Sequence, residues 1–158
     1  MMRRSFLAMA LVGAGAFPCA EASAQTAKTE RINPPGLMKP TGYTHTVTVQ
    51  GGKLVFVAGQ VALDKEGNVV GKGDLKAQAQ QVYDNLKLAL AAAGASPKDV
   101  VKAVGFVVNY NPSQLPVLRE ARQAFFGGAE PPASTLVGVQ ALAREDFLIE
   151  IEVVAVVP

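Results

Sequence analysis

The sequence contains few of the histidine and cysteine side chains that often carry out catalysis. It has one histidine, His45, and one cysteine, Cys19. No glycine-rich phosphate loop lies between a predicted strand and a predicted helix, and no spacing of His, Cys, Asp and Glu is typical of a metal site. Because no nucleophile motif accompanies His45, we interpret it as a structural residue at the start of a strand.

A carboxylate near the C-terminus is the best candidate for chemistry. Residues 147–157 are predicted to form a strand, on which successive side chains point to opposite faces. One set is entirely apolar and should meet the core: Ile149, Ile151, Val153 and Ala155. The other set includes Glu150 and Glu152, and a glutamate on a half-buried strand face can position or activate water. The alternative is that one of these glutamates makes a hydrogen bond or an ion pair between subunits.

The elements that would position such a residue follow from hydrophobic periodicity and turn residues. Gly51-Gly52 predicts a tight hairpin between the strands on either side of it. Asp74 can cap a helix that Gly94 ends. The predicted elements are strands 44–50, 53–58 and 61–63, helix 74–93, strand 100–109, helix 113–126, and strands 135–142 and 147–157.

This order predicts an α+β fold in which both helices cover one face of a mixed sheet of about six strands. The face without helices carries Glu150 and Glu152 beside apolar residues, which makes it poorly suited to full exposure. We therefore expect a homo-oligomer that buries this face. With 158 residues, a net charge of +2 and no basic stripe, the chain has room for one domain and gives no electrostatic support to nucleic-acid binding.

The N-terminal segment has the layout of a secretory signal. Two arginines precede an apolar run at 6–16, and Ala22-Ser23-Ala24 is a small-residue cleavage site. We predict that residues 1–24 are removed and that the mature protein is periplasmic or secreted. A core helix is the alternative for this segment, and the arginine pair leaves both the general secretory and the twin-arginine route open.

The mature chain would begin at Gln25. Cys19 lies in the part that is removed, so the mature protein would have no disulfide and no thiol. No later stretch is apolar for long enough to span a membrane. Residues 25–41 are rich in proline and polar residues and are predicted to form an extended lead-in.

Five short motifs lie in a fixed order between Ile32 and the C-terminal strand: Ile32-Asn33-Pro34, Gly42-Tyr43-Thr44-His45, Phe56-Val57-Ala58-Gly59-Gln60, Gln81-Val82-Tyr83-Asp84-Asn85-Leu86, and Pro132-Ala133 leading to Leu148-Ile149-Glu150-Ile151-Glu152. In these motifs the sequence, from Ile32 to its end, resembles the Rid/YjgF (RidA-like) family of reactive-intermediate deaminases. The resemblance makes 42–158 a Rid/YjgF-like domain and implies a chorismate-mutase-like fold. It also implies a homotrimer that binds small molecules in clefts between subunits, lined by the free sheet face. Members of the deaminase type hydrolyse 2-imino and 2-enamino acids to 2-oxo acids and ammonia, without a cofactor.

The resemblance further implies roles for individual residues. Glu150 matches the family's acid, which positions the attacking water. The positions that match substrate-binding residues are Tyr43, Ala58, Gly59, Asn111, Ser134 and Leu136.

Ser134 is where this chain departs from the deaminating members, which have an arginine there that grips the substrate carboxylate. Losing such a charge-assisted pair should cost on the order of a few kcal/mol. Either the ligand is not a carboxylate, or another cation reaches the cleft, or the activity is weak. Arg144 is the nearby candidate in the sequence, with a solvated loop charge as its alternative role. For the whole protein, the alternative is a non-catalytic trimer that binds a small molecule in its intersubunit cleft.

Overall fold

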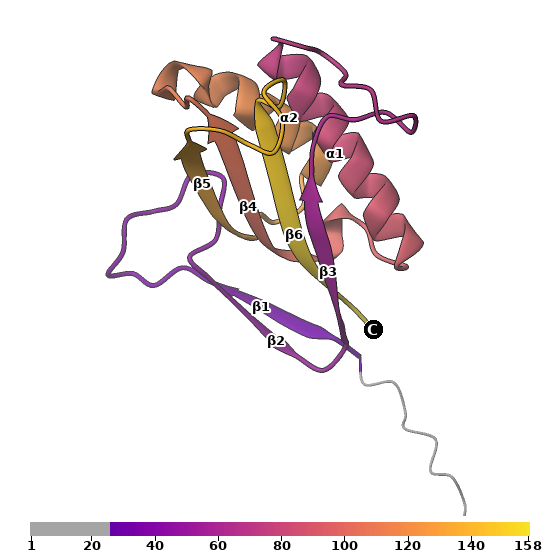
Figure 1. The fold of residues 1–158 in the computed structure, drawn as a ribbon. Coiled ribbons are helices and arrows are strands. Elements are labelled where there is room, and N and C mark those ends of the chain that lie inside the picture. Colours follow the sequence, from indigo (N-terminus) through magenta and orange to yellow (C-terminus); the bar gives the residue numbers. More distant parts are fainter. Residues whose placement is uncertain (1–25) are drawn as a thin grey trace, which may run out of the picture.

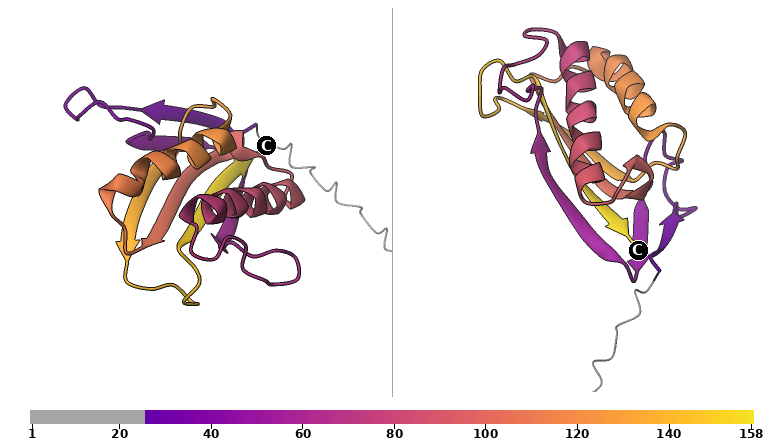
Figure 2. Two further views of the ribbon diagram at one scale, coloured as in Figure 1. Left: turned by 90° about the horizontal axis from the view of Figure 1, so that it is seen from above. Right: turned by 90° about the vertical axis from the view of Figure 1, so that its right-hand side faces the viewer.

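The computed structural model describes residues 26–158, so the predicted signal segment 1–24 lies outside the described residues. The fold is α+β, as predicted, and both helices cover the same face of the sheet (Figures 1 and 2). The elements are β1 Lys28–Ile32, β2 Thr46–Gln50, β3 Lys53–Gln60, α1 Leu75–Ala92, β4 Val100–Val108, α2 Leu115–Phe126, β5 Ala133–Val139 and β6 Ile149–Val157, with 3-10 turns at Pro97–Asp99 and Pro112–Gln114. Within 26–158, no helix is long and apolar enough to cross a membrane.

The six strands are divided between two sheets. The larger sheet has the order β3-β6-β4-β5, in which β6 runs antiparallel to both its neighbours and β4 and β5 are parallel. The smaller sheet is the antiparallel pair of β1 and β2. Figure 1 shows this pair standing apart from the larger sheet, near the end where β3 begins and β6 finishes. The predicted mixed sheet is therefore confirmed in the four strands of the larger sheet, and the other two of the six strands, β1 and β2, form a separate antiparallel pair.

The hairpin predicted at Gly51-Gly52 is wrong in its pairing. Both glycines adopt left-handed backbone angles, with φ of 73° and 74°. The chain leaves β2, which pairs with β1, and enters β3, which pairs with β6. A Cβ on Gly52 would lie 2.7 Å from the Val157 carbonyl oxygen, so the turn packs tightly against the end of β6. The physical reason is that the lead-in 25–41 supplies β1, and this strand takes the edge of β2 that β3 was expected to fill.

The third predicted strand, at 61–63, is also wrong. Leu63 forms only an isolated bridge with Val69. The side-chain amide of Asn85, on α1, donates to the carbonyl oxygens of Val61 and Leu63 at 3.0 and 2.9 Å. A helix side chain thus satisfies backbone groups that a neighbouring strand would otherwise have paired.

The core lies between the two helices and the sheet face that they cover. The Asp74 carboxylate accepts from the backbone N–H groups of Lys76 and Ala77, which confirms the predicted cap of α1. The alternation predicted for the last strand is confirmed, because its inward set is 0 to 5% exposed: Ile149, Ile151, Val153 and Ala155. The core therefore fixes β6, and with it the direction in which Glu150 points.

The opposite face of the sheet is open and carries large apolar side chains besides Glu150 and Glu152. Phe56 and Leu54 on β3 are 75% and 56% exposed. Phe56 lies beside Val154 of β6, and Val137 of β5 is also exposed. Large apolar side chains grouped on one face favour association with another surface.

Candidate functional site

The residues predicted for the site fall into two groups on this chain. Tyr43, Ser134 and Leu136 line one groove of about 820 Å³ between α2 and β5, which we call the α2–β5 groove. The other four are Ala58, Gly59, Asn111 and Glu150, none of which lines this groove. These four lie near the sheet end where β3 and β4 finish and β6 begins. We call Ala58, Gly59 and Glu150 the glutamate end.

Sheet register shows how far apart the two groups are. Ser134 pairs with Ala103 of β4, whereas Glu150 pairs with Phe106 of the same strand. Strand spacings of about 4.8 Å and a rise of about 3.3 Å per residue put the Cα atoms of Ser134 and Glu150 about 14 Å apart. Ser134 faces the helices, while Glu150 faces the open side of the sheet. One chain therefore does not bring these two side chains to a common point.

Glu150 occupies space that Gly59 leaves free. A Cβ on residue 59 would overlap the Oε1 atom of Glu150 and lie 2.7 Å from its Cδ. Glycine at position 59 is therefore needed for the carboxylate to lie flat against the end of β3. Glu150 itself is partly exposed, so its carboxylate is anchored by the strand yet accessible to water.

A buried glutamine sets the start of β6. Gln78 of α1 is fully buried, and its amide donates to the carbonyl oxygens of Asp146 and Gly71 at 2.7 and 3.2 Å. Its Oε1 accepts the backbone N–H of Leu148 at 2.8 Å, two residues before Glu150. Gln78 therefore positions the strand that carries Glu150. The sequence analysis missed it, although a glutamine one position before Ala79 on the apolar helix face was a visible signal.

Asn111 caps the turn that precedes α2. Its Oδ1 accepts the backbone N–H of Ser113 at 3.0 Å, and its own N–H donates to Gln114 Oε1 at 2.8 Å. Asn111 is exposed. This hydrogen bonding fixes the direction of the Asn111 side chain beyond the end of β4.

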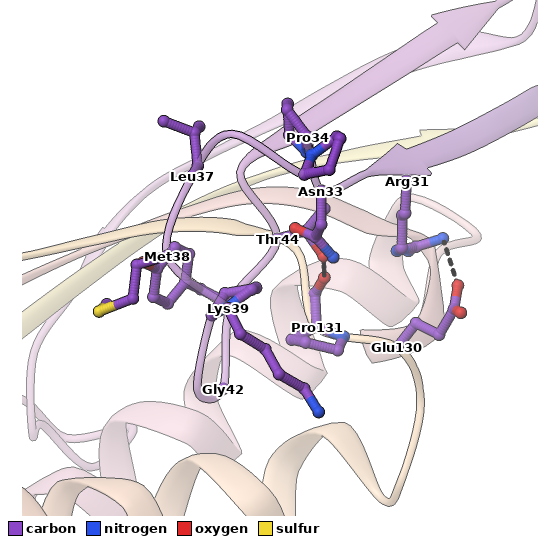
Figure 3. A pocket seen from close by; sticks show the side chains of 13 residues that line it. Arg31, Asn33, Pro34, Leu37, Met38, Lys39, Gly42, Thr44, Glu130 and Pro131 are labelled. Carbon is purple, nitrogen blue, oxygen red and sulfur yellow. Dashed lines mark hydrogen bonds and ion pairs between the residues drawn. The ribbon is translucent and has the colours of Figure 1, made fainter.

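Tyr43 lies beside the edge of β5 because the next residue, Thr44, is hydrogen-bonded to the segment that leads into this strand. The Thr44 hydroxyl donates to the Pro131 carbonyl oxygen at 2.6 Å (Figure 3). The Thr44 N–H donates to the Pro132 carbonyl oxygen at 3.0 Å. His45 Nε2 lies 2.8 Å from the Met38 carbonyl oxygen, and the His45 ring meets Tyr43 edge to face. His45 is thus used to shape the loop, which agrees with the structural role expected for it.

A smaller cavity of about 520 Å³ lies under the same loop. Arg31 of β1 and Glu130, before β5, form an ion pair of 3.9 Å at its side (Figure 3). Glu130 is mostly exposed, so this pair adds little to stability. Its position shows that β1 lies close to the segment that leads into β5.

The relatives of this chain decide its family. The family described as Endoribonuclease L-PSP matches residues 37–157. The chain belongs to this family. The chain is also similar to a RutC family protein of Pyrococcus abyssi, which is 38% identical over 118 residues that cover 74% of this chain and 88% of the relative.

Two further L-PSP family relatives extend the comparison. A 2-iminobutanoate/2-iminopropanoate deaminase of Dermatophagoides farinae is 32% identical over 126 residues, covering 80% of this chain and 94% of the relative. The crystal structure of YyfB from Yersinia pestis, a protein of unknown function in the conserved Rid family, is similar with a TM-score of 0.78 and 44% identity. The match covers 82% of this chain and 98% of YyfB. The resemblance to the Rid/YjgF family is therefore confirmed.

In this L-PSP family chain, a cation other than the expected one stands beside Ser134. Arg122 of α2 donates from Nη1 to the Ser134 hydroxyl at 2.7 Å, and its guanidinium lies over the ring of Phe126, 5.0 Å from the centroid. Arg144 is placed elsewhere, because it donates to the Gly67 carbonyl oxygen and lies over Phe147. The sequence analysis missed Arg122. The signal was its spacing of four residues from both Leu118 and Phe126 on the buried side of the helix.

The charged side chains that line the α2–β5 groove are all cationic among the described residues. Arg119 and Arg122 line it, and none of the described residues that line it is acidic. Burial lowers the pKa of Arg122 and raises the pKa of Tyr83, whose ring also lines the groove, to about 12. Arg122 remains charged and Tyr83 neutral at ordinary pH, so the groove suits an anionic ligand.

Proposed function

We propose that this protein is an exported hydrolase of imines and enamines, which it converts to oxo compounds and ammonia. The observation that carries the proposal is the fit of the Glu150 carboxylate against Gly59, at a partly exposed strand end. Support comes from the relative that is named as a 2-iminobutanoate/2-iminopropanoate deaminase. With a net charge of +2 and no basic stripe, nothing in the sequence points to nucleic acid as the ligand.

In the proposed reaction, Glu150 holds a water molecule and accepts one of its protons. The water oxygen forms a bond to the imine carbon as the C=N π bond breaks, and Glu150 gives the proton that it accepted to the nitrogen. Glu150 then accepts the hydroxyl proton of the resulting carbinolamine and gives it to the nitrogen, so that ammonia leaves as the C–N bond breaks and the C=O bond forms. Glu150 first accepts and later returns a proton, which is general acid–base catalysis by one carboxylate.

We infer that the working unit is a homotrimer whose clefts lie between subunits. The two groups of site residues are about 14 Å apart and on opposite faces of one chain, so a second copy is needed to bring an α2–β5 groove to a glutamate end. The exposed apolar face around Phe56 gives a reason for copies to associate. A closed cyclic assembly of three would form three equivalent clefts.

Glu150 can be tested against a matched residue of the same strand. Glu150→Gln removes the proton acceptor but keeps the size of the side chain, and it should lower the rate of ammonia release from freshly generated 2-iminobutanoate by about a hundredfold or more. Glu152→Gln changes an exposed glutamate two residues along the same face and should leave the rate unchanged. A Glu150→Gln variant with the wild-type rate would overturn the proposal. A wild-type rate equal to that of buffer would favour a trimer that only binds its ligand.

We also propose that residues 1–24 direct export and are removed. Support comes from the arrangement of arginines, apolar run and small-residue cleavage site in the sequence. Cell fractionation and N-terminal sequencing should find a mature chain that begins at Gln25 outside the cytoplasm. A chain that begins at Met1 and stays in the cytoplasm would contradict this.

A further inference from the structure

Arg122 is a partly buried cation without an anionic partner. No carboxylate lies within ion-pair distance of it among residues 26–158. Its Nη2 atom is buried and has no hydrogen-bond partner in the same part of the chain. Burying a charge without pairing it costs free energy, so such a group calls for an explanation.

The contacts that Arg122 does make hold it in place without neutralising it. The face of Phe126 supports the guanidinium, and the Ser134 hydroxyl accepts one hydrogen bond from Nη1. A hydroxyl that accepts from arginine still has its own proton to donate. Ser134 and Arg122 together therefore present donors and leave the acceptor to a ligand.

The α2–β5 groove supplies the room for that ligand. Its walls include apolar side chains such as Leu115, Leu118 and Leu136, and no described acidic residue lines it. Apolar walls strengthen the attraction between a guanidinium and an anion because they keep water away. The chemistry favours a small carboxylate with an apolar side chain, which offers two oxygens to the guanidinium fork and the Ser134 hydroxyl.

We propose that Arg122, oriented by Ser134 and Phe126, binds the carboxylate of the ligand and so replaces the arginine missing from position 134. The guanidinium reaches the groove from α2 instead of from β5. A serine at 134 suits this arrangement, because its small side chain leaves room for the Arg122 guanidinium and its hydroxyl accepts the hydrogen bond that orients the guanidinium. This proposal rests on the proposed function only for the choice of 2-oxo and 2-imino acids as ligands.

A matched pair of probes tests this binding mode in the full chain. 2-Oxobutanoate is the product expected from 2-iminobutanoate, and 2-oxobutanamide has nearly the same shape without the charge. Calorimetry should show the wild type binding the acid about tenfold or more tightly than the amide, as expected for a charge-assisted hydrogen-bonded pair. Arg122→Met should abolish this preference. Arg144→Met, which changes an arginine also stacked on a phenylalanine but remote from Ser134, should keep it.

The outcomes separate this proposal from the proposed hydrolysis. An Arg122→Met variant that still prefers the acid, or a wild type without a preference, would overturn the role of Arg122 even if ammonia is released. Binding that depends on Arg122 without ammonia release would support the role of Arg122 and count against hydrolysis. Should Arg122→Met fail to fold, Arg122→Gln keeps a polar side chain without the charge and is expected to lose the preference as well. An Arg122→Gln variant that retains the preference would overturn the proposal.

Discussion

The guanidinium of Arg122 donates a hydrogen bond of 2.7 Å to the hydroxyl of Ser134. This contact joins a helix residue that the sequence analysis did not single out to the strand position where an arginine was expected. The loss of a cation at 134 and the presence of one at 122 are therefore parts of one local arrangement. Of the three possibilities that Ser134 left open, this contact favours the one in which another cation reaches the cleft.

Restoring an arginine at 134 in the wild-type background should be harmful. Ser134→Arg removes the acceptor for Arg122 and places a second guanidinium beside it, which should lower the free energy of unfolding by about 1–3 kcal/mol. Urea unfolding would measure this, with Ser134→Ala as the control that loses only the acceptor. Combining Ser134→Arg with Arg122→Met should recover both stability and the preference for acid over amide. A single Ser134→Arg variant as stable as the wild type would show that Arg122 does not hold this space.

A side chain at position 59 should displace the proposed catalytic carboxylate. In Gly59→Ala, the new Cβ would overlap Glu150, so the carboxylate must move from the end of β3. We expect ammonia release to fall by about tenfold or more, since small displacements of a catalytic group are costly. Gly36→Ala is the control, because a Cβ there meets nothing within 4 Å. Equal rates of ammonia release in the two variants would show that catalysis does not depend on the fit of Glu150 against Gly59.

Much of the fold could be predicted because local patterns and packing agree in it. The alternation in β6 and the cap at Asp74 were visible in the sequence and were confirmed. The pairing of β2 could not be predicted in the same way, because it depends on β1, a polar strand within a proline-rich segment. Residues 61–63 have a strand-like pattern. Their backbone carbonyl oxygens, however, accept hydrogen bonds from the side chain of Asn85, which is more than twenty residues away in the sequence.

The site was predictable one residue at a time but not as an arrangement. Glu150 could be found from its place in an alternating strand. That Ser134 and Glu150 face opposite sides follows only from the register of β5 on β4 and of β4 on β6. Arg122 was hidden because its partner, Ser134, is twelve residues away and on another element.

The exposed face of the sheet should govern assembly. Phe56→Lys puts a charge where an apolar contact between copies is proposed, and sedimentation should show a shift from trimer toward monomer. Leu88→Lys makes the same kind of change at an equally exposed leucine of α1, on the helical side, and should leave the assembly unchanged. A Phe56→Lys variant that remains trimeric would place the interface elsewhere.

Tyr83 should make stability depend on pH in alkaline solution. Burial raises its pKa to about 12 in the folded protein, whereas tyrosine in an unfolded chain titrates near about 10. The unfolded state therefore loses the proton first, so this contribution is full below about pH 10 and is lost as the pH rises toward about 12. Urea unfolding near pH 8 and near pH 11 would measure a loss of about 1.4 kcal/mol, which is about half of the full effect expected for a shift from about 10 to about 12. Tyr83→Phe should show a smaller decrease, and an equal decrease in both proteins would contradict the burial of this hydroxyl.

Mixed assemblies test most directly whether two chains share one site. Arg122→Met and Glu150→Gln subunits, each assembled alone, should release ammonia from 2-iminobutanoate at about a tenth of the wild-type rate or less. Unfolding them together and refolding them in equal amounts should restore about a quarter of the wild-type rate of ammonia release, because in a cyclic trimer that share of clefts would combine an intact Arg122 from one chain with an intact Glu150 from the next. A mixture that releases ammonia as slowly as the two variants alone would contradict a site that is shared between subunits.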